Sequence, residues 1–151
     1  MRIDIPGRGS LSLEHAVFDF NGTLAEDGRV SIQVSELLTD VSTRYRTHLV
    51  TADTLGTVRP FAQRMGIACH IVQTGDDKRQ FVQGLTGGVV AVGNGANDGA
   101  MFAAAELAIG VIGPEAAALS ALLAADVVVR TVGDALQLLL VPTRLVATLR
   151  T

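Results

Sequence analysis

The sequence has one cysteine, one tyrosine and no tryptophan, and Lys78 is the only lysine among its 12 basic residues. A lone cysteine excludes a disulfide within the chain and is typical of a reducing compartment. No apolar run approaches the roughly 18 residues that a membrane-spanning helix needs. The opening residues, MRIDIPGRGS, have no apolar segment of the kind found in a signal peptide. We therefore expect a cytoplasmic protein with no membrane contact.

The charge pattern also excludes one class of partner. The formal net charge is −3, and the basic residues are scattered rather than clustered, which argues against a nucleic-acid surface. With 48% hydrophobic and 18% charged residues, the composition is that of a globular protein. A length of 151 residues favours a single domain over residues 1–151.

Short apolar runs alternate with helical patterns along the chain. A small N-terminal hairpin is predicted first, with strands at 2–5 and 10–14 around the turn PGRG. Further strands are predicted at 16–20, 47–50, 68–72, 88–93, 107–112 and 126–129. Helices are predicted at 31–45, 56–65, 76–85, 97–105, 114–124, 132–140 and 143–150, the fifth opened by Pro114. This alternation predicts an α/β fold: one Rossmann-like, doubly wound domain with a mainly parallel sheet.

Polar residues stand where these predicted strands end. Asp19 and Thr51 each follow an apolar run, Asn94 follows another, and Asp98 and Lys78 lie near helix starts. Because ligands bind at the carboxyl ends of the strands in such sheets, we expect these side chains to converge. A carboxylate can attack phosphorus, hydroxyl and ammonium groups can bind phosphate oxygens, and oxygen ligands suit Mg²⁺. Phosphoryl transfer is the chemistry that this set favours.

Four segments, taken in order, resemble a known family. DFNGTL (19–24), LVTAD (49–53), DK (77–78) and GNGANDGAM (93–101) are similar to the four motifs of the haloacid dehalogenase (HAD) superfamily. The last segment is especially similar to the phosphorylation domain of P-type ATPases, so the chain resembles small soluble members of that kind. The resemblance implies a Mg²⁺-dependent phosphohydrolase or phosphotransferase that acts through a phosphorylated aspartate.

The resemblance also implies roles for particular residues. Asp19 matches the nucleophile, Thr51 the phosphate-binding hydroxyl and Lys78 the lysine beside the phosphorylated aspartate. The expected catalytic residues are Asp19, Asn21, Thr51 and Lys78; the expected metal ligands are Asp19, Asn21 (through its main-chain carbonyl), Asn94 and Asp98; and the expected substrate-binding residues are Gly22, Thr23, Ala52 and Asn97.

Two residues depart from the family pattern. Asn21 stands where family phosphatases have an aspartate that acts as general acid and base, help that is worth about 10²–10⁴-fold in rate. Asn94 replaces another aspartate, which removes one formal charge from the metal pocket. We therefore expect slow turnover. A non-catalytic or regulatory module that binds phosphate and Mg²⁺ and partners another protein is the alternative, and slow deamidation of these two Asn-Gly pairs is a third possibility.

Structural roles compete with functional ones at several positions. Asn21–Gly22 alone is a typical hairpin turn, Thr51 and Asp98 also suit turn or helix-terminus positions, and Asp53 is expected to cap a helix. The three histidines show no metal-ligand spacing and are expected to be structural. The gaps between motifs leave no room for a cap domain, so the site should be open to a phosphorylated small molecule or a larger substrate. The apolar stretch 135–149 suggests a homo-oligomer interface.

Overall fold

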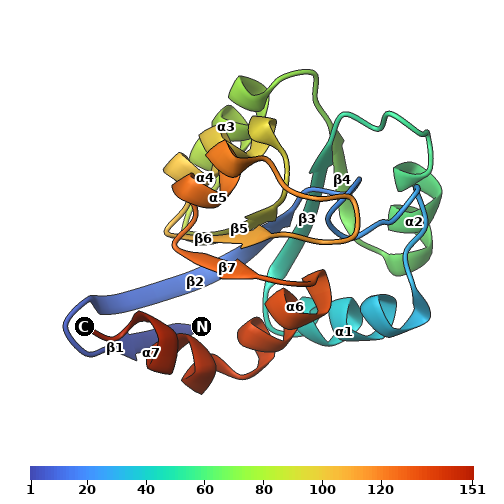
Figure 1. The fold of residues 1–151 in the computed structure, drawn as a ribbon. Coiled ribbons are helices and arrows are strands. Elements are labelled where there is room, and N and C mark those ends of the chain that lie inside the picture. The colour runs from blue at the N-terminus through green and yellow to red at the C-terminus, as the bar shows by residue number, and fades with distance from the viewer.

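The computed structural model describes all of residues 1–151 and has a central sheet with helices on both faces (Figure 1). The strands are β1 (Arg2–Ile5), β2 (Gly9–Phe18), β3 (Arg46–Thr51), β4 (Ala68–Ile71), β5 (Gly88–Gly93), β6 (Leu107–Val111) and β7 (Val127–Val129). Their order is β4-β3-β2-β5-β6-β7, and β1 pairs with β2 alone. Every pair is parallel except β1–β2, which confirms the predicted α/β class.

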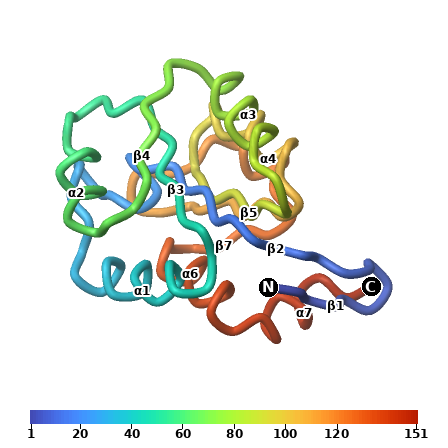
Figure 2. Tube along the Cα trace, turned by 180° about the vertical axis from the view of Figure 1, so that it is seen from behind, coloured from blue at the N-terminus to red at the C-terminus, as the bar shows by residue number.

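The helices form two layers around two hydrophobic clusters. They are α1 (Ile32–Ser42), α2 (Val58–Met65), α3 (Gly75–Gln83), the 3₁₀ turn η1 (Ala96–Asp98), α4 (Gly99–Ala104), α5 (Leu119–Ala124), α6 (Val132–Leu140) and α7 (Pro142–Leu149). The smaller cluster joins the sheet to α3, α4 and α5, and the larger one lies on the other side with α1, α2, α6 and α7. Figure 2 shows the same layers from behind. The sheet is thus doubly wound, as predicted.

The structure has one continuous strand where the sequence predicts two. The separate strands expected at 10–14 and 16–20 are a single strand, β2, whose pairing with β5 shifts register between Leu13 and His15. Its first half pairs with β1 in the hairpin, and its second half lies between β3 and β5 in the parallel sheet. The bulge lets one continuous strand serve both partners.

The helix expected at 114–124 begins only at Leu119. Ala116 has a φ of 65°, a left-handed conformation that cannot continue a right-handed helix. The main-chain N–H of Ala118 then donates to the main-chain oxygen of Asn94, 2.8 Å away. The prediction that Pro114 opens this helix was therefore wrong, because a contact with a distant loop fixes the backbone instead.

The apolar C-terminal stretch is largely buried within the chain. Leu136 and Leu139 of α6 and Leu145 of α7 are fully buried, α6 packs on α1, and α7 packs on β1. Both termini lie at the hairpin end of the molecule (Figures 1 and 2). No single helix is long and apolar enough to cross a membrane; α6 and α7 pass that test only together, bent by 101°. The apolarity that suggested an oligomer is thus accounted for inside the chain, and the oligomer itself stays a prediction.

All three histidines meet on one face of the sheet. The Nδ1 atom of His15 lies 3.1 Å from the Nε2 atom of His48, and the Nε2 atom of His15 lies 3.1 Å from the Thr86 oxygen. The rings of His48 and His70 both pack against Phe81 of α3. Because the Thr86 carbonyl only accepts, His15 donates from Nε2 and accepts the His48 N–H at Nδ1. The three rings pack against one another and against Phe81, contacts that nothing in their spacing predicts, and their structural role stays a prediction.

The histidine row makes the fold sensitive to acid. Burial lowers the pKa of His48 to about 4, helped by the neighbouring His15, and burial also lowers the pKa of His70. The unfolded chain therefore binds more protons, and stability falls as the pH drops from about 6.5 towards 4. Replacing His48 with phenylalanine should reduce the loss of unfolding free energy between pH 7.5 and 5.0 by about 1 kcal/mol, after allowing for solvent screening. Urea unfolding at both pH values measures this, and an unchanged pH dependence would contradict it.

Candidate active site

The polar residues predicted from the strand ends do meet. In the strand order β4-β3-β2-β5-β6-β7, successive strands are added outward in one direction from β2 to β4 and in the other direction from β5 to β7. The boundary between β2 and β5 is therefore the switch point where ligands bind in doubly wound sheets. Asp19 follows β2 directly, and its main-chain N–H donates to Val92 of β5 over 2.9 Å. Asn94 follows β5, and Thr51 is the last residue of β3.

A buried lysine joins two carboxylates at this point. The Nζ atom of Lys78 lies 2.7 Å from Oδ1 of Asp19 and 2.7 Å from Oδ1 of Asp98. The Lys78 and Asp98 side chains are 1% and 0% exposed, and that of Asp19 is 9% exposed. Two carboxylates and one ammonium leave a net charge of −1 in a buried cluster. The surplus charge lies on the side towards the pocket, at Asp19.

The cluster shifts the pKa values of its members. Burial, together with the charge of Asp98, raises the pKa of Asp19 to about 6 against the opposing effect of Lys78. Burial alone would lower the pKa of Lys78, but the two carboxylates keep it above its ordinary value. Lys78 is therefore charged at neutral pH. Asp19 is mostly ionised at pH 7.5 and mostly protonated at pH 5.

Local sequence explains how Lys78 reaches the cluster. Thr74 and Asp77 form a capping box at the start of α3, so this helix begins in the loop beside the site and places Lys78 in its first turn. A side chain at Gly75 would lie 2.7 Å from the main-chain oxygen of Asn97. Glycine at this position therefore allows α3 to approach η1, which carries Asp98.

Asp98 is held by the loop that follows β5. Its Oδ2 atom accepts the main-chain N–H of Asn94 over 3.0 Å and that of Gly95 over 2.9 Å. Together with Lys78, these donors engage both oxygens of the buried carboxylate. Asp98 therefore organises the loop as well as balancing the charge of Lys78.

A pocket of about 230 Å³ opens above Asp19. It is lined by Asp19, Asn21, Thr51, Ala52, Thr54, Asn94, Gly95 and Asn97. Eight of the predicted site residues thus lie in this pocket wall or in the cluster beneath it. Thr54 and Gly95 also line the pocket but were not among the predicted site residues, and no pattern in the sequence marks Thr54.

Two predicted substrate-binding residues lie behind Asp19 instead of in the pocket wall. Thr23 is 4% exposed, and its hydroxyl lies 3.3 Å from Oδ2 of Asp19 and 3.1 Å from Oδ1 of Asn94. Gly22 has a φ of 78° and packs against the Asn94 side chain. Both residues support the site from within the protein.

The Asn21–Gly22 pair does form a turn. The main-chain N–H of Gly22 donates to the Ala25 oxygen over 2.9 Å, and that of Ala25 donates to the Phe20 oxygen over 2.9 Å. The turn leaves Oδ1 of Asn21 buried without a hydrogen-bond partner. Asn21–Gly22 is thus a turn whose first residue also lines the pocket.

The hydrogen bonds around both Asn-Gly pairs oppose deamidation. That reaction needs the following main-chain nitrogen to attack the side-chain amide carbon. The nitrogen of Gly22 is bonded to Ala25, and the nitrogen of Gly95 is bonded to Asp98. The third possibility raised by the sequence, in which asparagines mature into aspartates, is therefore disfavoured by the folded structure.

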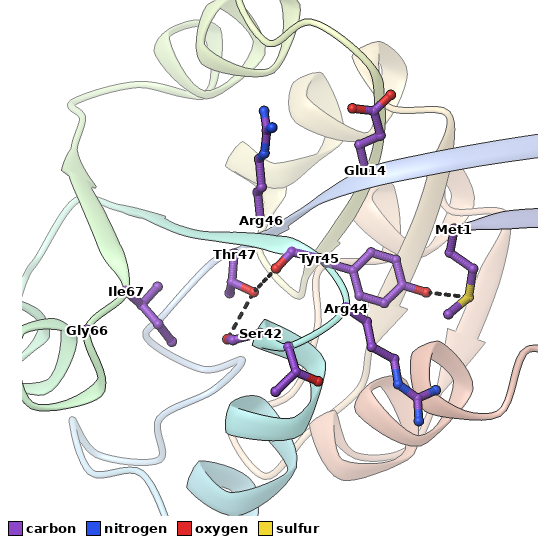
Figure 3. A pocket seen from close by; sticks show the side chains of 10 residues that line it. Met1, Glu14, Ser42, Arg44, Tyr45, Arg46, Thr47, Gly66 and Ile67 are labelled. Carbon is purple, nitrogen blue, oxygen red and sulfur yellow. Dashed lines mark hydrogen bonds between the residues drawn. The ribbon is translucent and has the colours of Figure 1, made fainter.

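A larger pocket lies elsewhere. A cavity of about 460 Å³ lies where α1 leads into β3. Figure 3 shows the side chains that line it, with Tyr45 donating to the sulfur of Met1 and Ser42 to Thr47. Arg46, which begins β3, lines it. This pocket is therefore at the amino ends of the strands and shares no residue with the motifs. The candidate site is therefore identified by the side chains that line it and not by the volume of the pocket.

Comparisons with known proteins agree with this fold. No family model matches the chain. An uncharacterized protein of Methanocaldococcus jannaschii is 47% identical over 62 residues, which are 41% of this chain and 67% of that protein. Among solved structures, a protein of Streptomyces avermitilis described as a HAD family hydrolase has a TM-score of 0.63 and 22% identity, over 84% of this chain and 82% of that chain.

Two further structures share the fold. The 3-deoxy-D-manno-octulosonate 8-phosphate phosphatase of Moraxella catarrhalis, solved with magnesium and phosphate ions and its sugar, has a TM-score of 0.72 and 17% identity, over 91% of this chain and 94% of that chain. A zinc-transporting PIB-type ATPase in its E2.Pi state has a TM-score of 0.64 and 20% identity, over 80% of this chain and 20% of the ATPase. The chain therefore shares the fold of these structures, and by sequence it belongs to the same family as the Methanocaldococcus protein.

Proposed function

We propose that the chain is a phosphohydrolase or phosphotransferase that acts through a phosphorylated Asp19. The observation that carries the proposal is the cluster in which Lys78 joins Asp19 and Asp98 beneath the pocket. A buried lysine fixed beside a carboxylate holds positive charge where a phosphate would add negative charge. Purified protein should therefore release phosphate from a small phosphate ester or acyl phosphate, in a metabolite screen with the Asp19→Asn variant as the blank.

The reaction takes place in two displacements. A carboxylate oxygen of Asp19 forms a bond to phosphorus while the bond from phosphorus to the leaving oxygen breaks, and the leaving group takes a proton from solvent. Water then attacks the phosphorus, the bond to Asp19 breaks, and inorganic phosphate and the free carboxylate are released. Thr51 and Lys78 bind phosphate oxygens during both steps. An acceptor alcohol in place of water would make the same chemistry a phosphotransfer.

The residues present fit Mg²⁺. The buried Oδ1 of Asn21 has no partner, and the donors around the pocket are carboxylate and amide oxygens, which suit a hard cation. Asp19, the main-chain carbonyl of Asn21 and the amide oxygen of Asn94 would hold the ion from the pocket side. Asp98, whose oxygens bond to Lys78 and to two main-chain N–H groups, would join them by exchanging one of these bonds. When bound, it would offset the negative charge of Asp19 and the phosphate. The magnesium and phosphate ions of the Moraxella phosphatase structure support this choice.

No cap domain covers the pocket. Between Asp19 and Thr51 the chain forms a turn and α1, and between Thr51 and Lys78 it forms α2 and β4. We infer that the substrate is a phosphorylated small molecule or a phosphate group on a larger one, with no size limit set by a lid. We also place the reaction in the cytoplasm.

The amide at position 21 should make turnover slow, because it cannot donate and recover a proton. Replacing Asn21 with aspartate should therefore raise the rate of phosphate release, by about 10²-fold or more if the new carboxyl serves as general acid and base. The measurement is steady-state hydrolysis of an aryl phosphate with Mg²⁺ across a range of pH. Gln63→Glu, an exposed amide-to-carboxylate change on α2, adds the same charge away from the pocket and should leave the rate within about threefold of wild type. Equal rates for wild type and Asn21→Asp would show that position 21 has no part in proton transfer.

A non-catalytic module that binds phosphate and Mg²⁺ and partners another protein is the second candidate. The observation that favours it is the replacement of a proton-donating carboxyl by the Asn21 amide. Single-turnover release of phosphate separates the two, since the module would bind phosphate without releasing any from an ester.

A further inference from the structure

Asn94 links three segments that surround the pocket. Its main-chain N–H donates to Asp98, and its main-chain oxygen accepts from Ala118 over 2.8 Å. Its side chain bonds in two directions: Nδ2 donates to the main-chain oxygen of Ala116 over 2.9 Å, and Oδ1 accepts from the hydroxyl of Thr23 over 3.1 Å. The amide thus spans the gap between the loop after β2 and the loop after β6.

The carbonyl of Ala116 fixes which way the amide points. Ala116 is one of three non-glycine residues with a positive φ, a conformation that costs about 1 kcal/mol or more and must be held by its surroundings. Its carbonyl can only accept a hydrogen bond, so it requires the NH₂ group of Asn94. A carboxylate at position 94 would place two acceptor oxygens about 2.9 Å apart, the distance that Nδ2 now spans.

The other end of the amide reaches the nucleophile through Thr23. The Thr23 hydroxyl shares its one proton between two acceptors, Oδ1 of Asn94 at 3.1 Å and Oδ2 of Asp19 at 3.3 Å. Glycine at position 22 is required, because a Cβ there would lie 2.6 Å from Nδ2 of Asn94. A Cβ at Gly113, in the loop after β6, would lie 3.2 Å from the Gly22 oxygen. The two loops are therefore in close contact around this one side chain.

We propose that Asn94 is a positioning residue whose amide joins Ala116 to Thr23, so that a carboxylate at position 94 would weaken the site instead of completing it. The catalytic part of this inference rests on the proposed function. It gives a physical reason for the departure from the family pattern: the loop after β6 demands a donor, and aspartate has none when ionised. The amide oxygen still has a second lone pair, so the tie does not prevent it from facing a bound ion.

The test compares Asn94→Asp with the wild type by amide hydrogen exchange and by phosphate release. The tie predicts that exchange in residues 113–118 becomes about three- to tenfold faster, since the surface hydrogen bond from Asn94 to the Ala116 oxygen is replaced by repulsion between two acceptors. It also predicts that kcat falls by about tenfold without tighter dependence on Mg²⁺. Gln63→Glu, an exposed amide-to-carboxylate change on α2, is the matched control and should alter neither quantity.

Thr23 variants test the second half of the tie. Thr23→Val removes the hydroxyl and should lower kcat by about tenfold while KM stays within about twofold, whereas Thr23→Ser should keep both near wild type. Because Asn94 acts through Thr23, combining Thr23→Val with Asn94→Asp should lower kcat by less than the product of the single effects. These variants also serve if Asn94→Asp fails to fold.

Unchanged exchange in residues 113–118, together with a higher kcat or tighter Mg²⁺ dependence in Asn94→Asp, would overturn the inference. Additive effects of the two substitutions would overturn the link through Thr23. If the wild type itself releases no phosphate that depends on Asp19, the proposed function fails, and the exchange comparison still decides whether the tie exists.

Discussion

Replacing Lys78 with methionine is expected to lower the free energy of unfolding at pH 7.5 by about 3 to 5 kcal/mol, the largest effect of any single change in the site. The substitution keeps a long side chain but removes the only cation between Asp19 and Asp98. Both carboxylates are buried, and each lies 2.7 Å from the Lys78 Nζ atom in the wild type. Two buried anions would then face each other without compensation. Urea unfolding followed by circular dichroism measures the loss.

The loss should depend on pH and on position. Because the pKa of Asp19 is already raised to about 6 and rises further without Lys78, protonation at pH 5 removes one of the two charges. The Lys78→Met defect should therefore be smaller at pH 5 than at pH 7.5. Arg79→Met, the half-exposed neighbour that pairs with Asp76, is the control and should cost less than about 1 kcal/mol. An equal loss of unfolding free energy in Lys78→Met and Arg79→Met would show that the buried cluster does not stabilise the fold as proposed.

Asp19→Asn should abolish phosphate release and yet stabilise the fold. The carboxylate is the nucleophile, so no phosphorylated intermediate can form on the amide. It is also the surplus charge of the cluster: a pKa of about 6 in place of 3.8 means that folding opposes its ionisation. The sign follows from linkage, since a raised carboxyl pKa makes the folded state less stable as the pH rises through about 6. We expect a gain on the order of 1 to 3 kcal/mol at pH 7.5 and little gain at pH 4.

Asp98→Asn is the matched comparison, because it neutralises the other carboxylate of the same cluster. Asp98 also accepts the main-chain N–H groups of Asn94 and Gly95, so this change should cost about 2 to 4 kcal/mol. A higher free energy of unfolding for Asp19→Asn and a lower one for Asp98→Asn would show that the Asp19 carboxylate serves the chemistry at a cost in stability, whereas the Asp98 carboxylate stabilises the fold. A destabilised Asp19→Asn protein would contradict the charge assignment.

Much of the fold follows from local sequence. The apolar runs of β3, β5 and β6 and the pattern of α6 predict their elements to within a residue or two, because each run is bounded by turn or capping residues such as Thr131. The region around Ala116 does not follow, because a hydrogen bond from Asn94 holds a conformation that no local signal favours. The continuous β2 was missed for a similar reason: its two halves differ only in their partners.

The candidate site shows the same division. The motifs place Asp19, Thr51, Lys78 and Asp98 at strand and helix ends, and parallel-sheet topology brings those ends together. The distances between these side chains do not follow from the motifs. That Lys78 joins two carboxylates, or that Thr23 lies behind the pocket, depends on segments that approach only in the folded chain. The sequence therefore predicts which side chains belong to the site, and the packing of the folded chain determines which of them are in contact.

The most direct test of the account is the site of phosphorylation. The protein is incubated with acetyl phosphate and Mg²⁺, quenched in acid, and digested for mass spectrometry, with Asp19→Asn treated alongside. We expect one added phosphoryl group on the peptide that contains Asp19, removed by hydroxylamine and absent from the variant. Phosphate release by wild type and variant at the same rate, or a phosphoryl group on any other residue, would contradict it.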